Sequence, residues 1–387
     1  MRKKFITIVL AVLFCFRFIS SAGALPSDSY TLVTESPSLS AKSAVLIDAA
    51  TNTVLCEKNA RERMGMASTT KIMTALVAAE HGDLDKTVSV SPLAVGVEGS
   101  SIYLYAGEQL KLCDLISAML LESANDAAAA IAIEIGGSIE GFCNMMNNKA
   151  AELGLADTHF TNPHGLYDDA HYTTAYDLAV IAAAALENDT VRQTVATKKM
   201  TITPIGNEGN MRVIYNHNKM LSLYEGAIGV KTGFTKKTGR CLVSAAERDG
   251  LRLVAVTLNA SDDWNDHKKL LDLGFDSFSR EELIKKGEVC HIMSIIGAAD
   301  SQLPLLSCET LYATLPKGID PQRLTMVVET LNRYEFAPVS EGRIVGRVLF
   351  YLDGHLIADA PLQAAHTAKR ADKDKKGFFE SIKDFFT

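Results

Sequence analysis

Three short motifs follow one another along the chain in a fixed order, and they constrain it more than any other feature. They are Ser68-Thr-Thr-Lys71, Ser123-Ala-Asn125 and Lys231-Thr-Gly233. Together they supply a nucleophile, a base to activate it, a proton relay and a cation for an anionic substrate. Each motif alone is common by chance, so the inference rests on their order and spacing. A fold that unites the three is suited to acyl transfer through a serine ester.

The tripeptide Lys-Thr-Gly occurs twice, at residues 231–233 and 237–239. We choose the first copy because the run at 226–230 before it is typical of a strand, which would put Lys231 near a strand end facing a cleft. Lys237 falls in the expected turn before the next strand. We interpret it as an exposed lysine.

The composition narrows the class of protein. The chain of 387 residues is longer than one typical domain, so we expect two. Hydrophobic residues make up 47%, enough for a sizeable core, and the net charge of −7 argues against a nucleic-acid-binding protein. The sequence has neither a zinc-type cluster of Cys and His nor a glycine-rich phosphate loop. We therefore expect no metal and no cofactor.

Residues 1–24 have the pattern of an export signal. A basic start, Met1-Arg-Lys-Lys4, precedes an apolar run at 5–16, and Ala22-Gly-Ala24 fits the small-residue cleavage rule. An uncleaved anchor is the alternative, although Arg17 disfavours a permanent span. Either way we expect the body of the protein at the outer face of the cytoplasmic membrane.

Six cysteines remain once Cys15 leaves with the signal. They are scattered singly, mostly in apolar runs. We interpret them as buried small hydrophobic residues, although an exported protein permits disulfides. Cys113 and Cys241 lie near the motifs in sequence, so a thiol close to the cleft is a further hypothesis.

Hydrophobic periodicity predicts an α+β catalytic domain over residues 43–280, after a Ser-, Thr- and Pro-rich linker at 25–42. Its later strands indicate an antiparallel sheet beside a cluster of helices. We expect helices at residues 68–80, 110–121, 127–135, 139–153, 174–187 and 262–279. We expect an early hairpin at 44–56 and later strands at 199–203, 211–215, 226–233, 240–247 and 251–258.

Beyond Gly287 the pattern changes to strand-like runs separated by turns, which predicts a small all-β, sandwich-like domain over residues 287–362. Residues 366–387 are interpreted as a flexible tail with an amphipathic end. We expect that end to form a helix lying on the membrane surface. A disordered tail, or a helix that docks on another protein, is the alternative. The apolar residues on one face of this helix are Phe378, Phe379, Ile382, Phe385 and Phe386.

Two further segments extend the pattern: Phe160-Thr-Asn-Pro-His-Gly-Leu166 and His171-Tyr-Thr-Thr-Ala-Tyr-Asp-Leu178. With these landmarks the chain resembles the low-molecular-mass penicillin-binding proteins, the serine-type D-alanyl-D-alanine carboxypeptidases, from Ala41 to Leu362. The resemblance implies a β-lactamase/DD-peptidase-like domain, a peptidoglycan stem peptide ending in D-Ala-D-Ala as substrate, and β-lactam antibiotics as inhibitors. One departure is His217, which stands where several relatives have an arginine near the substrate carboxylate.

Residue chemistry and the resemblance together assign roles. Ser68, at the start of a helix, is the expected nucleophile, and Lys71, one turn later on the same face, is the expected base if its amine is neutral. The resemblance brings Lys231 close enough to lower the pKa of Lys71. Ser123 would pass a proton to the leaving amine. The expected substrate contacts are Asn125, Lys231, Thr232, Gly233 and Thr235, with the backbone N–H groups of Ser68 and Phe234 as the oxyanion hole.

Two other functions stay open. A serine β-lactamase would share the same residues, but the sequence has no clear Glu-x-x-Leu-Asn segment for deacylation, and Glu152-Leu-Gly-Leu is a poor match. A catalytically inactive wall-binding protein of the same fold would not need Lys71. Within the enzyme class, endopeptidase and transpeptidase activity stay open as well.

Overall fold

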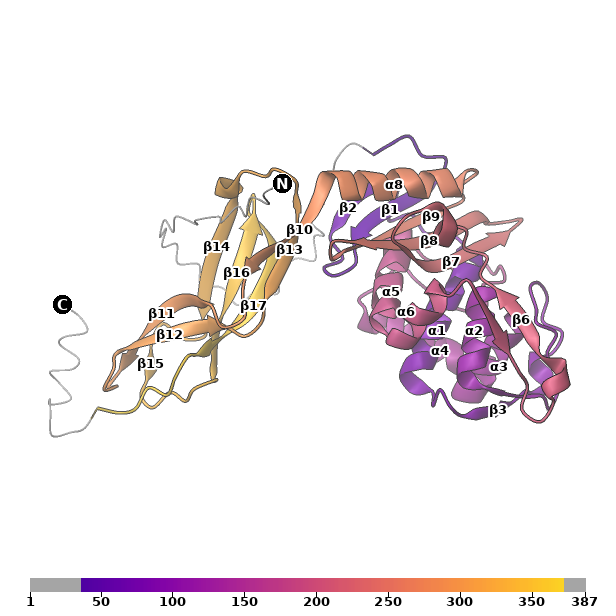
Figure 1. The fold of residues 1–387 in the computed structure, drawn as a ribbon, viewed down its shortest axis with the longest axis horizontal. Helices are drawn as coiled ribbons and strands as arrows, with labels where there is room; N and C mark the ends of the chain where they lie inside the picture. The colour runs from indigo at the N-terminus through magenta and orange to yellow at the C-terminus, as the bar shows by residue number, and fades with distance from the viewer. Residues whose placement is uncertain (1–35, 372–387) are drawn as a thin grey trace, which may run out of the picture.

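The computed structural model describes residues 36–371, which form two parts side by side (Figure 1). The first part mixes helices and strands, and the second is built of strands. The export signal expected at 1–24 and the amphipathic end expected after residue 376 both lie outside the described residues.

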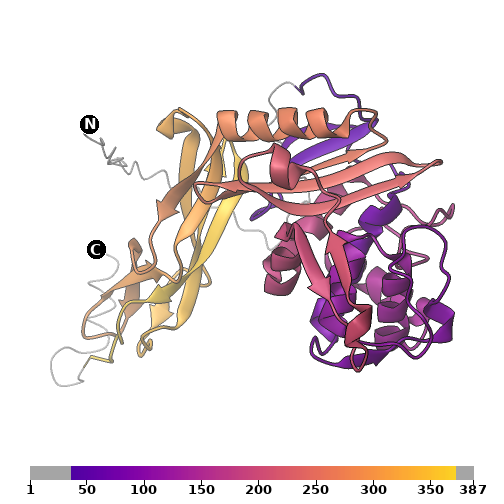
Figure 2. The same cartoon turned by 45° about the vertical axis from the view of Figure 1, so that its right-hand side comes forward.

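A five-stranded sheet lies at the centre of the first part, in the order β2-β1-β9-β8-β7 with every pair antiparallel. Its strands are β1 (Ser43–Asp48), β2 (Val54–Lys58), β7 (Ala227–Thr235), β8 (Gly239–Arg248) and β9 (Leu251–Leu258). Every residue of β1 is buried, because helices lie against both faces of the sheet (Figure 2). Aliphatic side chains fill β1 and β9, as a strand covered on both faces requires.

One long helix covers one face of this sheet, and a cluster of helices covers the other. The long helix is α8 (Asp263–Ser277). The cluster comprises α1 (Lys71–His81), α2 (Leu112–Leu121), α3 (Asn125–Gly136), α4 (Ile139–Glu152), α5 (Ala175–Glu187) and α6 (Asp189–Ala196). Ser138, Thr174 and Asn188 cap the N-termini of α4, α5 and α6 by accepting hydrogen bonds from backbone N–H groups.

The helices expected from periodicity are all present, with ends that differ by a few residues. Two short helices, α6 and α7 (Met220–Leu223), were not expected. In α6 only Val191 and Val195 are buried, so its apolar period is too short to stand out in the sequence.

Two antiparallel ribbons lie apart from the central sheet. One pairs β3 (Thr87–Ser89) with β4 (Gln109–Lys111). The other pairs β5 (Lys199–Ile202) with β6 (Arg212–Tyr215). The expectation that these last two strands join the antiparallel sheet is wrong. They contact helix α2 instead, and Ile214 of β6 is buried in the same apolar cluster as residues of that helix.

The second part follows α8 without a break. Strand β10 (Phe278–Ile284) begins at the residue after α8 and pairs with β13 (Leu311–Pro316). The chain therefore enters the all-β part at Phe278, ahead of Gly287. A larger sheet has the order β14-β16-β17-β12-β11-β15. Its strands are β11 (Val289–Ile296), β12 (Gln302–Ser307), β14 (Leu324–Thr330), β15 (Glu335–Phe336), β16 (Ile344–Leu352) and β17 (His355–Ala364). The α+β class with a small all-β part second is confirmed.

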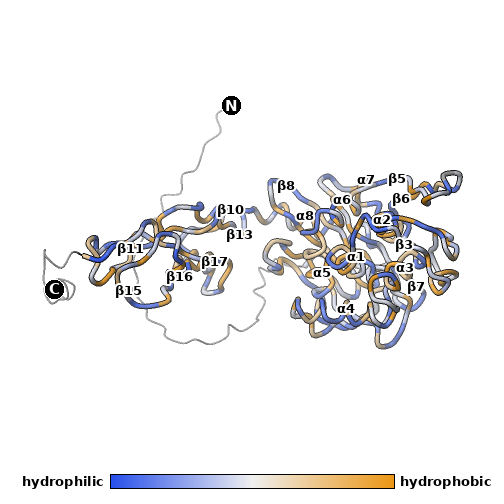
Figure 3. Tube along the Cα trace, turned by 90° about the horizontal axis from the view of Figure 1, so that it is seen from below, coloured by the Kyte–Doolittle hydropathy of each residue, from blue (hydrophilic) through white to orange (hydrophobic). Residues whose placement is uncertain are grey.

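A shared apolar cluster joins the two parts. Leu46 and Phe275 of the first part lie in one buried cluster with Leu315 of the second. Beside it, Thr314 Oγ1 donates a hydrogen bond of 3.0 Å to Asp48 Oδ2. Hydrophobic segments run through the interior of both parts, with hydrophilic turns between them (Figure 3).

Both ends of the described chain are held by the fold. Ser40 N and Ala41 N, at the end of the segment interpreted as a linker, donate to the Asp266 carboxylate at 3.0 and 2.9 Å. Ala368 forms a β-bridge with Val339. Among residues 36–371, no helix combines the length and the apolar character needed to cross a membrane.

Candidate active site

The first two motifs meet around the amine of Lys71. Ser68 lies in a short 3-10 helix, η1 (Ala67–Thr70), and Lys71 is the first residue of α1. The Lys71 Nζ donates hydrogen bonds to Ser68 Oγ at 3.1 Å, to Asn125 Oδ1 at 2.6 Å and to the His164 carbonyl oxygen at 2.6 Å. Lys71 has 0% of its surface exposed. The amine is thus fixed against the serine by two acceptors from other segments.

Burial sets the charge of this amine. Removal from water lowers the pKa of Lys71 well below its usual value, and the charge of Lys231 lowers it further, against a smaller opposing effect of Asp126. Burial also lowers the pKa of Lys231 to about 7. The charge of Lys231 therefore favours the neutral form of the Lys71 amine. A neutral amine beside the Ser68 hydroxyl can accept its proton.

The third motif lies in the middle of β7, which packs directly on η1. A Cβ atom placed on Gly233 would lie 3.0 Å from Ser68 N and 3.1 Å from Thr69 N. The backbone after Gly233 therefore runs beside the Ser68 N–H. Phe234 exposes 65% of its surface, so its side chain does not fill this space. Thr232 and Thr235 are half-buried.

Ser123 occupies the turn between α2 and α3, where its backbone has a left-handed φ of 61°. Two segments hold this turn. On one side, Asn125 N donates to the Ser100 carbonyl at 2.7 Å, and Asn125 Nδ2 donates to the Glu98 carbonyl at 2.5 Å. On the other side, the Glu122 carboxylate is hydrogen-bonded to the last residue of β6, Tyr215, and to His217 after it.

His217 makes one of those bonds. Its Nε2 lies 2.9 Å from Glu122 Oε2, and Tyr215 N donates to Glu122 Oε1 at 2.6 Å. His217, the residue that departs from the family pattern, therefore bonds the residue that precedes Ser123 in the sequence, and its own side chain is exposed.

Some of the predicted site residues are hydrogen-bonded to one another in the structure, and others have no hydrogen bond to Lys71. Hydrogen bonds link Ser68, Lys71 and Asn125. Among the hydrogen bonds of residues 36–371, none links Ser123 or Lys231 to Lys71. Lys231 Nζ donates instead to the Thr232 carbonyl at 3.0 Å. The second Lys-Thr-Gly copy lies in the turn after β7, where exposed Lys237 stacks 4.7 Å from the ring centre of Tyr167.

Sequence reasoning missed one group that contributes through its backbone, the His164 carbonyl oxygen, which accepts a hydrogen bond from Lys71 Nζ. The next residue, Gly165, has a φ of 87°, and a Cβ atom there would lie 1.9 Å from the Ala67 carbonyl oxygen. Only glycine allows this loop to approach η1 so closely. The His-Gly pair in the segment at 160–166 was the available signal.

Cys241 is the thiol nearest to the motifs in the sheet, because it pairs with Gly233 across β7 and β8. Burial raises the pKa of this thiol to about 11, which makes it unreactive near neutral pH. The six cysteines of the described chain are all unpaired.

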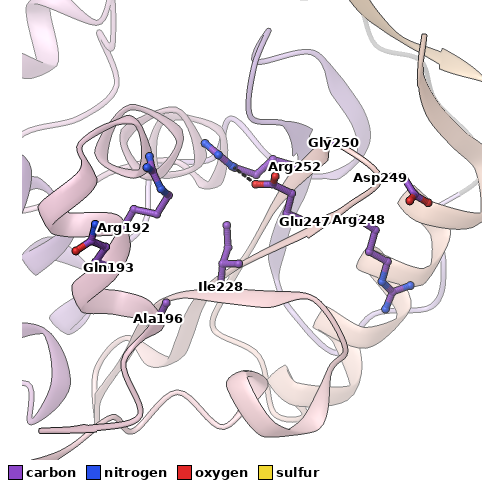
Figure 4. Close-up of a pocket in the computed structure, with 9 residues that line it drawn as sticks. All are labelled: Arg192, Gln193, Ala196, Ile228, Glu247, Arg248, Asp249, Gly250 and Arg252. Atoms are coloured by element: carbon purple, nitrogen blue, oxygen red, sulfur yellow. Dashed lines mark hydrogen bonds and ion pairs between the residues drawn. The ribbon is translucent and has the colours of Figure 1, made fainter.

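A separate hollow of about 600 Å³ lies where β7 begins and α6 ends (Figure 4). None of the predicted site residues lines it. Its arginines already have partners: Arg252 pairs with Glu247 and Glu187, and Arg192 pairs with Asp189. We assign it no function.

Comparison with known proteins identifies the family. A family profile described as D-alanyl-D-alanine carboxypeptidase matches residues 31–262. The chain belongs to the D-alanyl-D-alanine carboxypeptidase family. A second profile, described as the penicillin-binding protein 5 C-terminal domain, matches residues 278–370. The family expected from the sequence is confirmed, and the β-lactamase alternative is not favoured.

Relatives of this carboxypeptidase family align over most of the chain. D-alanyl-D-alanine carboxypeptidase DacF of Bacillus subtilis (strain 168) is 32% identical over 89% of this chain and 88% of the relative. DacC of Escherichia coli (strain K12) is 30% identical over 91% of this chain and 88% of the relative. Penicillin binding protein 5 from Haemophilus influenzae has a TM-score of 0.73 at 27% identity, over 86% of this chain and 99% of that one. The Streptomyces K15 DD-transpeptidase has a TM-score of 0.60 at 32% identity, over 63% of this chain and 100% of that one.

The contact at Gly165 generates a prediction. Gly165→Ala forces a Cβ atom into the Ala67 carbonyl, so we expect lower thermal stability and a displaced Ser68 that reacts with a fluorescent penicillin at least tenfold more slowly. The matched control is Gly137→Ala, which has a similar φ of 71° but nothing within 4 Å. It should cost only the backbone strain, about 1 kcal/mol, and leave labelling unchanged. Equal labelling rates in both variants would contradict the role given to this contact.

Proposed function

We propose that this member of the family removes the terminal D-alanine from peptidoglycan stem peptides through an ester on Ser68. The observation that carries the proposal is the buried Lys71 amine, 3.1 Å from Ser68 Oγ and held by Asn125. A buried lysine that is directed at a serine hydroxyl, and whose hydrogen bonds go to no carboxylate, has the arrangement of a base and not of a structural ion pair.

The reaction then takes two stages. Ser68 Oγ attacks the carbonyl of the penultimate D-alanine while its proton passes to Lys71. The backbone N–H groups of Ser68 and Phe234 stabilise the oxyanion. The terminal D-alanine leaves with a proton delivered from Lys71 through Ser123. Water, activated by Lys71, hydrolyses the ester and restores the serine.

Recognition of the substrate uses the open edge of β7. Lys231 in its charged form, with the hydroxyls of Thr232 and Thr235, binds the terminal carboxylate. Gly233 lets this strand lie against η1, as its 3.0 Å approach to Ser68 N indicates. Asn125 bonds the peptide backbone through the second N–H of its amide, because the first donates to the Glu98 carbonyl. A β-lactam enters the same space as a mimic of the dipeptide and leaves a long-lived ester on Ser68.

The family is one of cell-wall carboxypeptidases, consistent with a site of action outside the cytoplasm. We further infer that the protein works at the outer face of the cytoplasmic membrane, held there by the amphipathic residues 376–387. What supports this is the sequence: five apolar residues on one helical face, opposite charged ones.

The first test is covalent labelling. Fluorescent penicillin should label the wild type and not Ser68→Ala, because the hydroxyl that forms the ester is gone. The same variant should release no D-alanine from a peptide ending in D-Ala-D-Ala. Ser222→Ala, an exposed serine of α7, is the control and should behave as the wild type. Undiminished labelling of Ser68→Ala would overturn the assignment of the nucleophile.

A second prediction concerns pH. The value of kcat/KM should rise with pH as Lys71 loses its proton, and fall again near pH 7 as Lys231, whose pKa is lowered to about 7, loses the charge that binds the carboxylate. Arginine stays charged across this range. In Lys231→Arg the falling limb should therefore move to higher pH while the rising limb stays below it, whatever the loss in absolute rate. A falling limb unchanged in Lys231→Arg would assign it to another group.

A third prediction concerns the tail. Removal of residues 376–387 should move the protein from the membrane fraction to the soluble fraction, because the apolar face that would enter the lipid boundary is lost. Hydrolysis of a soluble peptide should not change, since the site lies wholly within the described first part. Membrane association that survives the deletion would contradict the anchor.

A further inference from the structure

An exposed tyrosine lies beside the second motif in an unusual backbone conformation. Tyr103 exposes 85% of its surface, while its neighbours Ile102 and Leu104 are buried. Its φ of 58° lies in the left-handed region, which a bulky side chain rarely adopts. Such strain persists only where the surroundings enforce it, and it marks positions with a function.

A buried carboxylate enforces this conformation. Asp126, the residue after Asn125, accepts hydrogen bonds from Ser101 Oγ at 2.6 Å and from Leu104 N at 3.0 Å. Ser101 Oγ in turn accepts from Tyr103 N at 2.9 Å. The α3 N-terminus that positions Asn125 therefore also presents the Tyr103 ring to solvent.

The same segment lines the site. The Ser100 carbonyl accepts from Asn125 N, and Tyr103 follows three residues later, which places it within roughly 10 Å of that contact along the backbone. A second hold comes from β6: Arg212 donates to the Ile102 carbonyl at 2.9 Å and pairs with buried Glu108. Tyr103 is thus an exposed aromatic platform on a fixed backbone near the Asn125 turn.

The charge of the segment indicates what the platform contacts. Between Glu98 and Glu108 the chain has no basic residue, so it offers nothing to the carboxylates of a stem peptide. An aromatic ring with a hydroxyl tip fits an uncharged ring that has one apolar face and polar edges, which is the chemistry of a sugar. A peptide of four residues spans at most about 14 Å, which limits how far from Ser68 a sugar attached to the stem peptide can lie.

We propose that Tyr103 is a substrate-positioning residue that stacks against a sugar ring of the glycan strand when the enzyme acts on polymeric peptidoglycan. This inference rests on the proposed function and adds to it the part of the substrate that lies outside the cleft. The ring then favours polymeric substrate over a free peptide through KM, and leaves the chemical step unchanged.

The test compares Tyr103→Ala with Tyr103→Phe. Both keep a Cβ atom and thus the backbone strain, but only phenylalanine keeps the ring. On purified peptidoglycan, Tyr103→Ala should lower kcat/KM about fivefold, equivalent to about 1 kcal/mol. The effect should appear as a higher KM with kcat unchanged. Tyr103→Phe should restore most of it. On a short peptide ending in D-Ala-D-Ala, all three proteins should be equal. Leu93→Ala, which removes another large exposed side chain, is the control on both substrates.

Other outcomes reject the proposal. Equal losses on polymer and short peptide would make Tyr103 a support of the Asn125 turn. If Tyr103→Ala also lowered kcat/KM on a complete stem peptide without sugar, the Tyr103 ring would contact the peptide and not the glycan. Unchanged kcat/KM of Tyr103→Ala on every substrate would show that Tyr103 has no role in binding. Failure of the proposed function itself would appear as an inactive wild type. A binding assay without turnover separates the two cases: Ser68→Ala should sediment with insoluble peptidoglycan, and Ser68→Ala/Tyr103→Ala should do so about fivefold more weakly.

Discussion

The chemistry of this protein depends on one lysine amine that is buried without a carboxylate to neutralise it. Lys71 donates to a serine hydroxyl, an amide oxygen and a backbone carbonyl, all of them uncharged. Such a site holds a charged ammonium poorly, because neutral dipoles replace the hydration shell only in part. The neighbouring cation Lys231 adds to the effect. The fold thereby prepares a neutral base before any substrate arrives.

The segments around this amine are held in conformations that cost free energy. Ala67, Ser123 and Tyr103 are non-glycine residues with left-handed φ. Ala67 precedes Ser68, Ser123 is itself a site residue, and Tyr103 follows three residues after Ser100, whose carbonyl accepts from Asn125 N. Gly99 and Gly165 allow backbone contacts with Asn125 and with Ala67 that a side chain would block. Other non-glycine residues with left-handed φ, such as Asn52 and Asp249, lie in turns between strands, so such strain is not exclusive to the loops around the site. A rigid scaffold of this kind can keep catalytic groups in place without the help of a substrate.

Much of this could be predicted from the sequence. The motifs, the helices with clear apolar periods and the β-rich second part leave direct signals, because residue type alone carries them. The rest depends on tertiary contact. The His164 carbonyl acts through the backbone, so the type of residue at position 164 does not reveal its role. Only Gly165 after it indicates a close backbone approach. The β5–β6 ribbon has strand-like composition but no feature that tells which sheet it joins. Helix α6 is stabilised by its Asn188 cap and by two valines, too few for a period.

The direct passage from α8 into β10 bears on how the two parts move. No loop separates the helix from the strand, and the buried cluster around Leu46, Phe275 and Leu315 spans the junction. Bending there would expose apolar surface to water, at about 25 cal/mol for each Å². The β part is consequently held firmly against the first part. If the tail tethers the chain, as we propose, the length of the β part sets the height of the cleft above the lipid, and only wall layers at that depth come within reach of Ser68.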